Sequence, residues 1–345
     1  MKTVHFVYVL PSSGNLISKV FRRVLHREMS RMGSVAAFKW PNPLRAPQSI
    51  TFFVGQSLET RYKVKLYDLR ENLTICPAPG DILLGHLWAD RNTVIWNSIN
   101  DSRFSKKILI QPYNNNAAQL GWVRDGLKFC DGLIAIGGDY WVDNFSESPL
   151  KDFGEKIFHL NMAVDASSYP IVKNEFNPPN KRRFLYIGRQ GRFGDEKGIG
   201  LLEELAKRIP NFQGGYICAG AEIKGWKKIS EPTALTPDLM KIIARDYDVL
   251  INMSRADAQA TTILEAMSWG YPVACTNQSG YSREKSFFYL SLENMNHNVD
   301  VIDEIQNLSD DEIKSISVEN RLVVENKYSW GVFVSKFEIV LRSIL

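Results

Sequence analysis

Two carboxylates eight residues apart are the side chains of this chain best placed to do chemistry. Asp257 lies in a polar loop that follows the apolar run 249–253, and Glu265 lies on a predicted helix, 261–270. A second apolar run, 271–276, follows that helix. Because open α/β sheets bind ligands at the carboxyl ends of parallel strands, the pattern predicts two acids at a ligand-binding edge. The alternative is a loop-capping Asp257 and a solvated helix acid at Glu265, since most charged residues are exposed.

A Gly-rich basic loop provides the complementary charge. An apolar strand is predicted at 184–187, and a helix follows the loop, which carries Gly188, Arg189, Gly191, Arg192, Gly194 and Lys197. Backbone N–H groups exposed by glycines, a helix N-terminus and several cations together form an anion site. The alternative is a solvated basic turn, but Arg189 comes directly after a strand and therefore lies at the ligand-facing edge.

In the first half of the chain, polar residues also follow predicted strands. His86 comes after the run 81–85, and Asn114 and Asn115 come after the run 107–111. We expect His86 at the ligand edge and the two asparagines near a second substrate. A single histidine after a strand also has a structural interpretation, as a hydrogen-bonded group of the interior.

The segment around the two acids resembles the nucleotide-sugar-binding core of retaining glycosyltransferases of the GT-B fold, family 4. That family has E-x7-E, a helix ending in Gly and a strand led by Pro; here Asp257 stands for the first acid and Glu265 for the second. The rest of the pattern is matched by Ala266, Met267, Gly270, Pro272 and Val273. The Asp at position 257 is one methylene shorter than the family's Glu.

Further motifs are similar to the same family. Its "GR…eKG…l" motif is matched by Gly188, Arg189, Glu196, Lys197, Gly198, Leu201 and Leu202, and its crossing segment by Asn161, Val164, Asp165 and Pro170. His86 stands where the family has a histidine beside the transferred sugar. Gly14 is the remaining glycine of a loop that approaches the donor phosphates.

The resemblance implies a role for each of these residues. Arg189 and Lys197 would grip the donor diphosphate, with Arg192 as a third contact. Glu265 would accept hydrogen bonds from ribose hydroxyls, and Asp257 would contact sugar hydroxyls. The other expected donor-binding residues are Gly14, Gly188, Leu235, Ala258 and Thr261, and the expected acceptor-binding residues are Asn114 and Asn115. No side chain is placed as a covalent nucleophile, and no metal or other cofactor is expected, because the cations replace Mg²⁺.

Alternation of strands and helices predicts an α/β protein with parallel sheets. We expect two Rossmann-like, doubly wound domains facing a cleft: an acceptor domain, 1–170; a linker, 171–182; a nucleotide-sugar domain, 183–325; and a helix, 326–345, crossing back to the first domain. In the first half the predicted strands are 3–10, 35–40, 51–54, 81–85, 107–111 and 132–136, and the predicted helices are 16–32, 117–128 and 139–145.

Composition agrees with two globular domains. The chain has 345 residues, more than single cores usually reach, and 44% of them are apolar. The net charge of +4 is too small to indicate nucleic-acid binding. Four widely spaced cysteines predict buried free thiols in a reducing cytoplasm and have no metal-site spacing. The predicted helix 16–32 carries five cations, which would give at most weak, peripheral contact with an anionic membrane.

The expected function is therefore transfer of a sugar from a nucleoside-diphosphate sugar to a hydroxyl of a glycan, glycolipid or small molecule, with retained configuration, in bacterial-type surface glycan or glycolipid synthesis. One alternative is a catalytically silent nucleotide-sugar-binding protein of the same fold. The other is a Rossmann-type epimerase or dehydrogenase, which would need G-x-G-x-x-G after the first strand. The sequence there is PSSGNLIS, which lacks that pattern.

Overall fold

The structure is a computed structural model that describes residues 2–11, 34–41, 44–115, 117–190, 195–220, 222–231 and 235–345, without the side chains of 117–119. The chain divides into two compact units. Unit 1 comprises Met1–Ile136, Phe145–Leu160 and Phe333–Leu345, and unit 2 comprises Gly137–Asn144 and Asn161–Val332. The predicted helix 16–32 and Gly14 lie outside the described residues.

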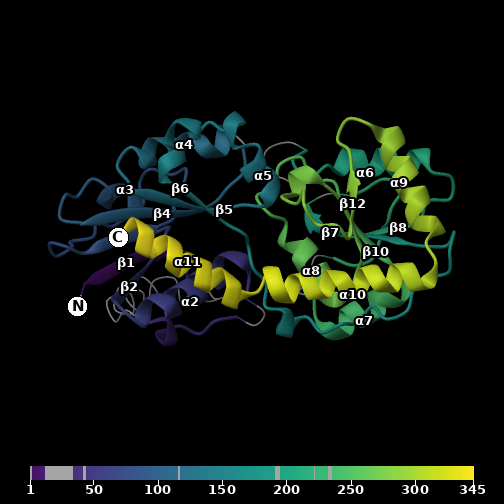
Figure 1. Ribbon diagram of the computed structural model, residues 1–345, viewed down its shortest axis with the longest axis horizontal. Coiled ribbons are helices and arrows are strands. Elements are labelled where there is room, and N and C mark those ends of the chain that lie inside the picture. Colours follow the sequence, from purple (N-terminus) through teal and green to yellow (C-terminus); the bar gives the residue numbers. More distant parts are fainter. Residues whose placement is uncertain are drawn as a thin grey trace. The chain divides into compact units, whose positions relative to one another are not determined.

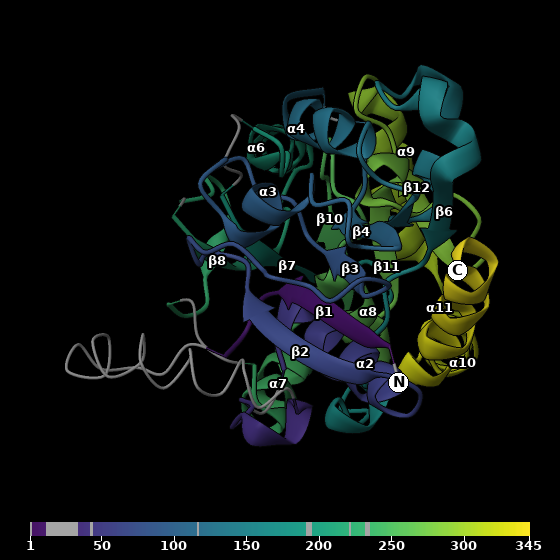
Figure 2. The same ribbon diagram turned by 90° about the vertical axis from the view of Figure 1, so that its left-hand side faces the viewer.

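Unit 1 is built on a parallel six-stranded sheet in the order β2-β1-β3-β4-β5-β6. Its strands are β1 (Thr3–Tyr8), β2 (Lys63–Asp68), β3 (Ile82–Gly85), β4 (Lys106–Pro112), β5 (Gly132–Ile136) and β6 (Ile157–Leu160). Its helices are α2 (Ala46–Glu59), α3 (Val94–Ser98), α4 (Ala117–Leu127) and most of α11 (Trp330–Ile344), with 3-10 turns η1 (Val35–Ala37), η2 (Phe145–Glu147) and η3 (Lys151–Lys156). Helix α2 lies on one face of the sheet, and α3 and α4 lie on the other (Figures 1 and 2).

Unit 2 contains a second parallel six-stranded sheet, in the order β12-β11-β10-β7-β8-β9. Its strands are β7 (Phe184–Arg189), β8 (Gly214–Ala219), β9 (Lys227–Lys228), β10 (Val249–Asn252), β11 (Val273–Thr276) and β12 (Phe287–Leu290). Its helices are α5 (Asp139–Asp143), α6 (Ile199–Arg208), α7 (Pro237–Asp246), α8 (Thr261–Trp269), α9 (Met295–Asn307) and α10 (Asp310–Lys327), with 3-10 turns η4 (Ala166–Ser168) and η5 (Asn277–Ser279).

Apolar side chains on both faces of this second sheet explain why its strands read as continuous apolar runs. Helices α6 and α9 cover one face, where a core cluster joins residues such as Leu202, Ile302 and Tyr216. Helices α7, α8 and α10 cover the other face (Figure 1). The described residues therefore form a doubly wound α/β layer in each unit, as the alternating pattern predicted.

Two predicted strands of the first half are wrong. Residues 51–54 lie inside helix α2, where Ile50, Thr51, Val54 and Leu58 are buried at helical spacing. Pro47 lies in the first turn of that helix, where its fixed φ is favourable. The run 51–54 is part of a longer pattern of buried residues with the helical period.

The predicted strand at 35–40 begins instead as the 3-10 turn η1. The Ser34 side chain accepts a hydrogen bond from the Ala36 N–H and so caps this turn. Val35 packs closely on α2, because a Cβ built on Gly55 would lie 2.5 Å from the Val35 Cγ2 atom. This tertiary contact favours a compact turn over an extended strand.

The polar segment that precedes β7 is held within unit 2 by buried charge. Lys173 and Asp248 form an ion pair of 2.9 Å between side chains that are 1% and 0% exposed. The Lys173 ammonium also donates to the Ala244 carbonyl oxygen at 2.7 Å. Removing one member of such a pair would leave the other buried and uncompensated, so the pair fixes this segment to α7 and the start of β10.

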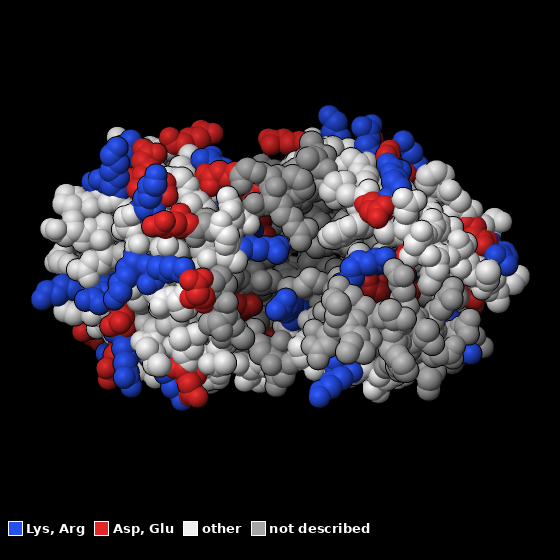
Figure 3. Space-filling model, turned by 180° about the vertical axis from the view of Figure 1, so that it is seen from behind, with Lys and Arg blue, Asp and Glu red and all other residues white. Residues whose placement is uncertain are grey.

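Charged side chains of both signs are interspersed on the face drawn in Figure 3, in keeping with 42 basic and 38 acidic residues. Cys130, Cys218 and Cys275 are buried free thiols, whereas Cys76 is exposed, which corrects the expectation of burial for that residue. Among the described helices, none combines the length and the low polarity that a membrane span requires.

Candidate functional site

The order of strands in unit 2 places the two candidate loops side by side. Read from β9, the sheet runs β9-β8-β7-β10-β11-β12, so the chain order reverses between β7 and β10. At such a switch point the connections after the two central strands diverge and leave a crevice at the carboxyl edge. The loop with Arg189 and Lys197 follows β7, and the loop with Asp257 follows β10.

An ion pair joins these two loops. The Lys197 ammonium bonds to Oδ2 of Asp257, and the two side chains are 20% and 24% exposed. The residues are 60 positions apart in sequence. The structure thus brings together two of the predicted site residues, a cation and an acid, at the switch point of the sheet.

The position of Lys197 is fixed by the glycine that follows it. Gly198 has φ +66° and is the N-cap of α6. A Cβ at this position would lie 2.0 Å from the carbonyl oxygen of Met253, at the end of β10. Only glycine accommodates both the positive φ and this approach. The glycine of the motif therefore lets α6 begin directly against β10 and brings Lys197 to Asp257.

The Asp257 loop is held by its own backbone. The Asp257 N–H donates to the carbonyl oxygen of Gln278 (2.9 Å), the Ala260 N–H to that of Ser279 (3.0 Å) and the Arg255 N–H to that of Glu196 (2.7 Å). These bonds attach the loop to η5 on one side and to the Lys197 loop on the other. The acid is therefore carried on a pre-organised segment.

Glu265 differs from an ordinary helix acid. It lies on α8 with a partly exposed side chain, yet surrounding protein buries the carboxyl and raises its pKa to about 7. Desolvation is the cause of this shift, and within the described part of the chain no hydrogen bond or cation offsets it. A desolvated carboxyl without a partner is suited to accept hydrogen bonds from ligand hydroxyls.

The remaining predicted donor residues lie around the same edge. Gly188 and Arg189 end β7, and the Arg189 side chain is exposed, without an ion-pair partner among the residues that are described. Ala258 and Thr261 flank the start of α8, whose N-cap Ala260 makes no side-chain capping bond. Leu235 directly precedes the N-cap of α7 and is partly buried. Arg192 and Gly14 are outside the described residues.

In unit 1 the chain order reverses between β1 and β3, and His86 directly follows β3. The His86 N–H donates to the Val7 carbonyl oxygen at 2.9 Å, and the ring packs edge-to-face on Tyr8 at 5.2 Å. The ring is 8% exposed, and burial lowers its pKa to about 4, so it is neutral at pH 7. Its Nδ1 atom has no hydrogen-bond partner among the residues that the structure describes. His86 thus offers a neutral imidazole nitrogen at the switch point of this sheet.

The two predicted acceptor residues follow β4 in unit 1. Asn114 is buried, and the Oδ1 atom of Asn115 accepts a hydrogen bond from the Tyr113 hydroxyl at 2.9 Å. Close by in the sequence, Gln111 bonds to both the N–H and the carbonyl oxygen of Leu87, at 3.1 and 3.3 Å. Gln111 thereby fixes the backbone between His86 and the partly exposed Trp88. The asparagines belong to unit 1, whereas Asp257 and Glu265 belong to unit 2.

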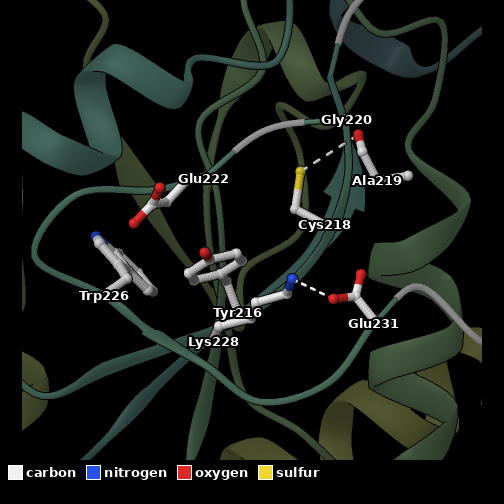
Figure 4. Close-up of a pocket in the computed structure, with 8 residues that line it drawn as sticks. All are labelled: Tyr216, Cys218, Ala219, Gly220, Glu222, Trp226, Lys228 and Glu231. Atoms are coloured by element: carbon white, nitrogen blue, oxygen red, sulfur yellow. Dashed lines mark hydrogen bonds and ion pairs between the residues drawn. The ribbon is translucent and has the colours of Figure 1, made fainter.

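A pocket of about 650 Å³ lies at the β8–β9 end of the sheet in unit 2. Figure 4 shows its lining, which includes an ion pair between Lys228 and Glu231 and two aromatic rings, Tyr216 and Trp226. Ala219 and Gly220, at the carboxyl end of β8, also line it. The Gln190 N–H donates to the Ala219 carbonyl oxygen at 2.7 Å, so the pocket adjoins the residue after Arg189.

Sequence reasoning missed the residues that hold the Asp257 loop from outside. Trp141 Nε1–H donates to the carbonyl oxygen of Asp257 at 2.6 Å, and the Met162 N–H donates to Oε1 of Gln259 at 2.5 Å. The glycine pair 137–138 at the end of β5 was the available signal, since glycines there mark a close approach of backbones. In the described ranges, no group of three or more His, Cys, Asp or Glu residues is arranged to hold a metal ion.

Comparison with known proteins shows the fold. No protein-family model and no curated protein matches the chain. Among solved structures, sucrose-phosphate synthase from Thermosynechococcus elongatus aligns with a TM-score of 0.61 at 12% identity, covering 100% of this chain and 99% of that one. An E. coli structure described as trehalose-6-phosphate bound with UDP-2-fluoroglucose gives a TM-score of 0.59 at 12% identity and covers 100% of both chains.

The lipopolysaccharide outer core galactosyltransferase WaaB, in its apo form, gives a TM-score of 0.57 at 15% identity and also covers 100% of both chains. A match to TarM covers 75% of this chain but 54% of that longer one. The matches to sucrose-phosphate synthase, the E. coli structure and WaaB each cover this whole chain, and so both of its α/β units. The chain therefore has the GT-B fold of these glycosyltransferases.

Proposed function

We propose that the protein is a nucleotide-sugar-dependent glycosyltransferase. The observation that carries this proposal is the Lys197–Asp257 ion pair at the switch point of the unit 2 sheet, and the desolvated acid Glu265 on α8 adds to it. A cation for a diphosphate, an acid for sugar hydroxyls and an acid for ribose hydroxyls are the groups that a nucleoside-diphosphate sugar requires. The fold shared with glycosyltransferases supports the same class.

In this proposal the donor diphosphate occupies the edge formed by the β7 and β10 loops. It displaces the Asp257 carboxylate from Lys197, which then faces the phosphates together with Arg189. Both cations stabilise the charge that develops on the leaving diphosphate. The N-terminus of α8, which has no side-chain cap, adds the positive end of a helix dipole. Asp257, once released, accepts hydrogen bonds from hydroxyls of the sugar.

We place the nucleobase beside Ala219 and Gly220, at the mouth of the pocket between β8 and β9. Backbone groups there can read the base, and Tyr216 and Trp226 provide apolar walls. The ribose would then lie toward Glu265, and its hydroxyls would supply the hydrogen bonds that this carboxyl lacks.

The reaction follows the retaining course that the motifs imply. The acceptor hydroxyl attacks the anomeric carbon on the face that the diphosphate leaves, and the leaving phosphate oxygen takes the hydroxyl proton. Arg189 and Lys197 supply the positive charge, and no metal is assigned a part. The acceptor is a glycan or glycolipid of surface-glycan synthesis, a class supported by the fold shared with WaaB. Any contact with a membrane through residues 16–32 rests on sequence alone.

The test begins with thermal-shift measurements on the full chain with UDP, GDP, ADP and their sugars. Stabilisation by one nucleotide family identifies the base, and release of that nucleoside diphosphate with candidate acceptors then measures transfer. Proton NMR of the product gives the anomeric configuration. Binding without any transfer across a broad acceptor panel would favour the catalytically silent alternative, and no binding at all would refute the proposal.

A further inference from the structure

A short segment between β5 and η2 belongs to the donor-binding unit, although its neighbours in sequence do not. Residues Gly137–Asn144 are part of unit 2, whereas the preceding Ile136 and the following Phe145 are part of unit 1. The segment carries the helix α5. The contacts of α5 explain why these eight residues are part of unit 2.

Two consecutive carbonyl groups of the Asp257 loop accept hydrogen bonds from this segment. The Trp141 Nε1–H donates to the Asp257 carbonyl oxygen at 2.6 Å, and the Gly138 N–H donates to the Ala258 carbonyl oxygen at 2.8 Å. Trp141 is only 5% exposed, so water cannot easily replace its bond. Together with the bond from the Asp257 N–H to Gln278, these contacts fix the backbone on both sides of the Asp257 side chain.

The backbones of three segments meet here without side chains between them. A Cβ on Gly138 would lie 1.5 Å from the Gly280 carbonyl oxygen. Gly280 itself has φ +95°, and a Cβ there would lie 2.6 Å from the Ala258 carbonyl oxygen. Both glycines are therefore required for α5, η5 and the Asp257 loop to stack directly on one another.

Polar contacts around the rim hold α5 in the same place. The Gln278 amide donates to the Tyr140 hydroxyl at 3.1 Å, Lys327 pairs with Asp139 at 2.9 Å, and Arg283 pairs with Asp143. The Arg283–Asp143 pair is exposed and contributes little by itself, whereas the Lys327–Asp139 pair is partly buried. The buried indole bond and the glycine contacts are therefore the features that determine the position of the loop.

We propose that α5 is a positioning element for the reaction, in which Trp141 sets the orientation of Asp257 toward the donor sugar. Trp141 acts through the Asp257 backbone and does not itself touch the sugar. The inference rests on the proposed function for its catalytic consequence, but the constraint that α5 places on the loop is a property of the protein alone.

The test uses the variant Trp141→Phe, which lacks the indole N–H but keeps an aromatic ring. In the wild type the ring centroids of Trp141 and Tyr140 are 4.8 Å apart and the rings meet edge-to-face. Trp122→Phe is the matched control, because the buried Trp122 Nε1 atom has no hydrogen-bond partner in the described part of the chain and so loses no bond seen there. Hydrogen–deuterium exchange of the peptide that contains residues 255–260 is measured in wild type and both variants, alongside nucleoside-diphosphate affinity, kcat and KM.

With the loop released, its amides should exchange about threefold faster or more in Trp141→Phe only. The value of kcat should fall about tenfold, with nucleoside-diphosphate affinity within about twofold, because the diphosphate contacts are not altered. Unchanged exchange in this peptide would overturn the inference. A lower melting temperature with unchanged exchange and kcat would also overturn it, since that is the signature of a purely structural tryptophan.

The exchange measurement separates this inference from the proposed function. Faster exchange in a protein that binds no nucleotide would refute the glycosyltransferase proposal and leave the constraint by α5 supported. If the wild type binds nucleotide and transfers sugar, but Trp141→Phe changes neither the exchange of residues 255–260 nor kcat, the glycosyltransferase proposal is supported and the inference about α5 is refuted.

Discussion

Replacing Glu265→Gln should make the protein more stable at pH 8 while weakening its binding of nucleoside diphosphate. The carboxyl has an ordinary pKa of 4.5 and a pKa of about 7 in the folded protein, because burial disfavours the charged form. Ionising it in the folded state therefore costs about 3 kcal/mol of folding free energy. This figure is an upper bound, since the side chain keeps partial exposure to solvent.

The pH dependence of this stabilisation has a definite sign. Below pH 4.5 the group is protonated in both states, and its contribution to the free energy of unfolding is the same as that of a neutral amide. As pH rises from 4.5 to 7 the unfolded chain loses the proton first, so the wild type loses stability, and above pH 7 the loss is complete. The difference between variant and wild type should thus be close to zero near pH 4.5 and largest at pH 8.

Urea unfolding at pH 5 and pH 8 measures this difference. Because the variant is compared with the wild type at the same pH, the titration of every other group cancels. Glu319→Gln on α10 is the matched control, because Glu319 is an exposed helix acid. We expect the control to remain within about 0.5 kcal/mol of wild type at both pH values. The prediction concerns the free energy of unfolding of Glu265→Gln minus that of wild type. If this difference is the same at pH 5 and pH 8, or is smaller at pH 8, the assignment of a desolvated carboxyl is refuted.

The functional half of the prediction uses calorimetry with the nucleoside diphosphate. Hydrogen bonds to a charged acceptor are about twice as strong as those between neutral groups, so the variant should bind about tenfold more weakly, or by about 1.4 kcal/mol. Wild-type affinity should rise between pH 6 and pH 8, because ribose hydroxyls need the ionised acceptor, whereas the affinity of the variant should remain flat. Unchanged affinity in the variant would show that Glu265 is a structural acid.

Other predictions concern the cations and His86. Lys197→Ala should lower kcat about 30- to 900-fold, the equivalent of about 2–4 kcal/mol for one charge-stabilising donor, whereas Lys207→Ala, at an exposed lysine in the last turn of α6, should leave it unchanged. Near-normal turnover of Lys197→Ala would exclude the role. His86 should stay neutral from pH 8 to pH 5 in an NMR titration, because burial holds its pKa at about 4, and its contribution to stability should be lost as pH falls from 6.5 toward 4. A midpoint near 6.5 would contradict the buried geometry. Turnover should persist in excess chelator, and its abolition with recovery on adding Mg²⁺ would contradict the assignment of the positive charge to Arg189 and Lys197.

The strands that the sequence predicted at 184–187, 249–253 and 271–276 in unit 2 are confirmed, whereas two of those predicted in unit 1 are wrong. Runs such as 184–187 and 271–276 are apolar because both faces of a parallel strand are covered by helices, and this burial is visible in composition alone. Gly198 and Gly270 could also be recognised from the sequence. Gly198 precedes the first residue of α6 and Gly270 follows the last residue of α8, each at a positive φ that other residues disfavour. The resemblance to family 4 of the GT-B glycosyltransferases, of whose motifs these glycines are part, is what grouped Lys197, Asp257 and Glu265.

Secondary structure was predicted wrongly where the local sequence pattern favours one element and tertiary contacts favour another. The run 51–54 has strand-forming residues, but it lies in a helix because its buried positions line one helical face against β1 and β2. The strands β2 and β6 were not predicted at all, since their half-buried patterns are short and mixed in polarity. Short segments of this kind take their structure from what they pack against.

Residue types and spacing by themselves determined an α/β chain with one acid and a set of cations on loops at strand ends and a second acid on the helix that follows, because burial and glycine geometry can be recognised in the local sequence. Only the tertiary structure decided that Lys197 pairs with Asp257 and that Glu265 is a desolvated acid with a pKa near 7. It alone showed that Trp141, 116 residues away in sequence, holds the loop in place. Ion pairing, desolvation and backbone contact each depend on which segments meet in space, and no local pattern specifies the partner.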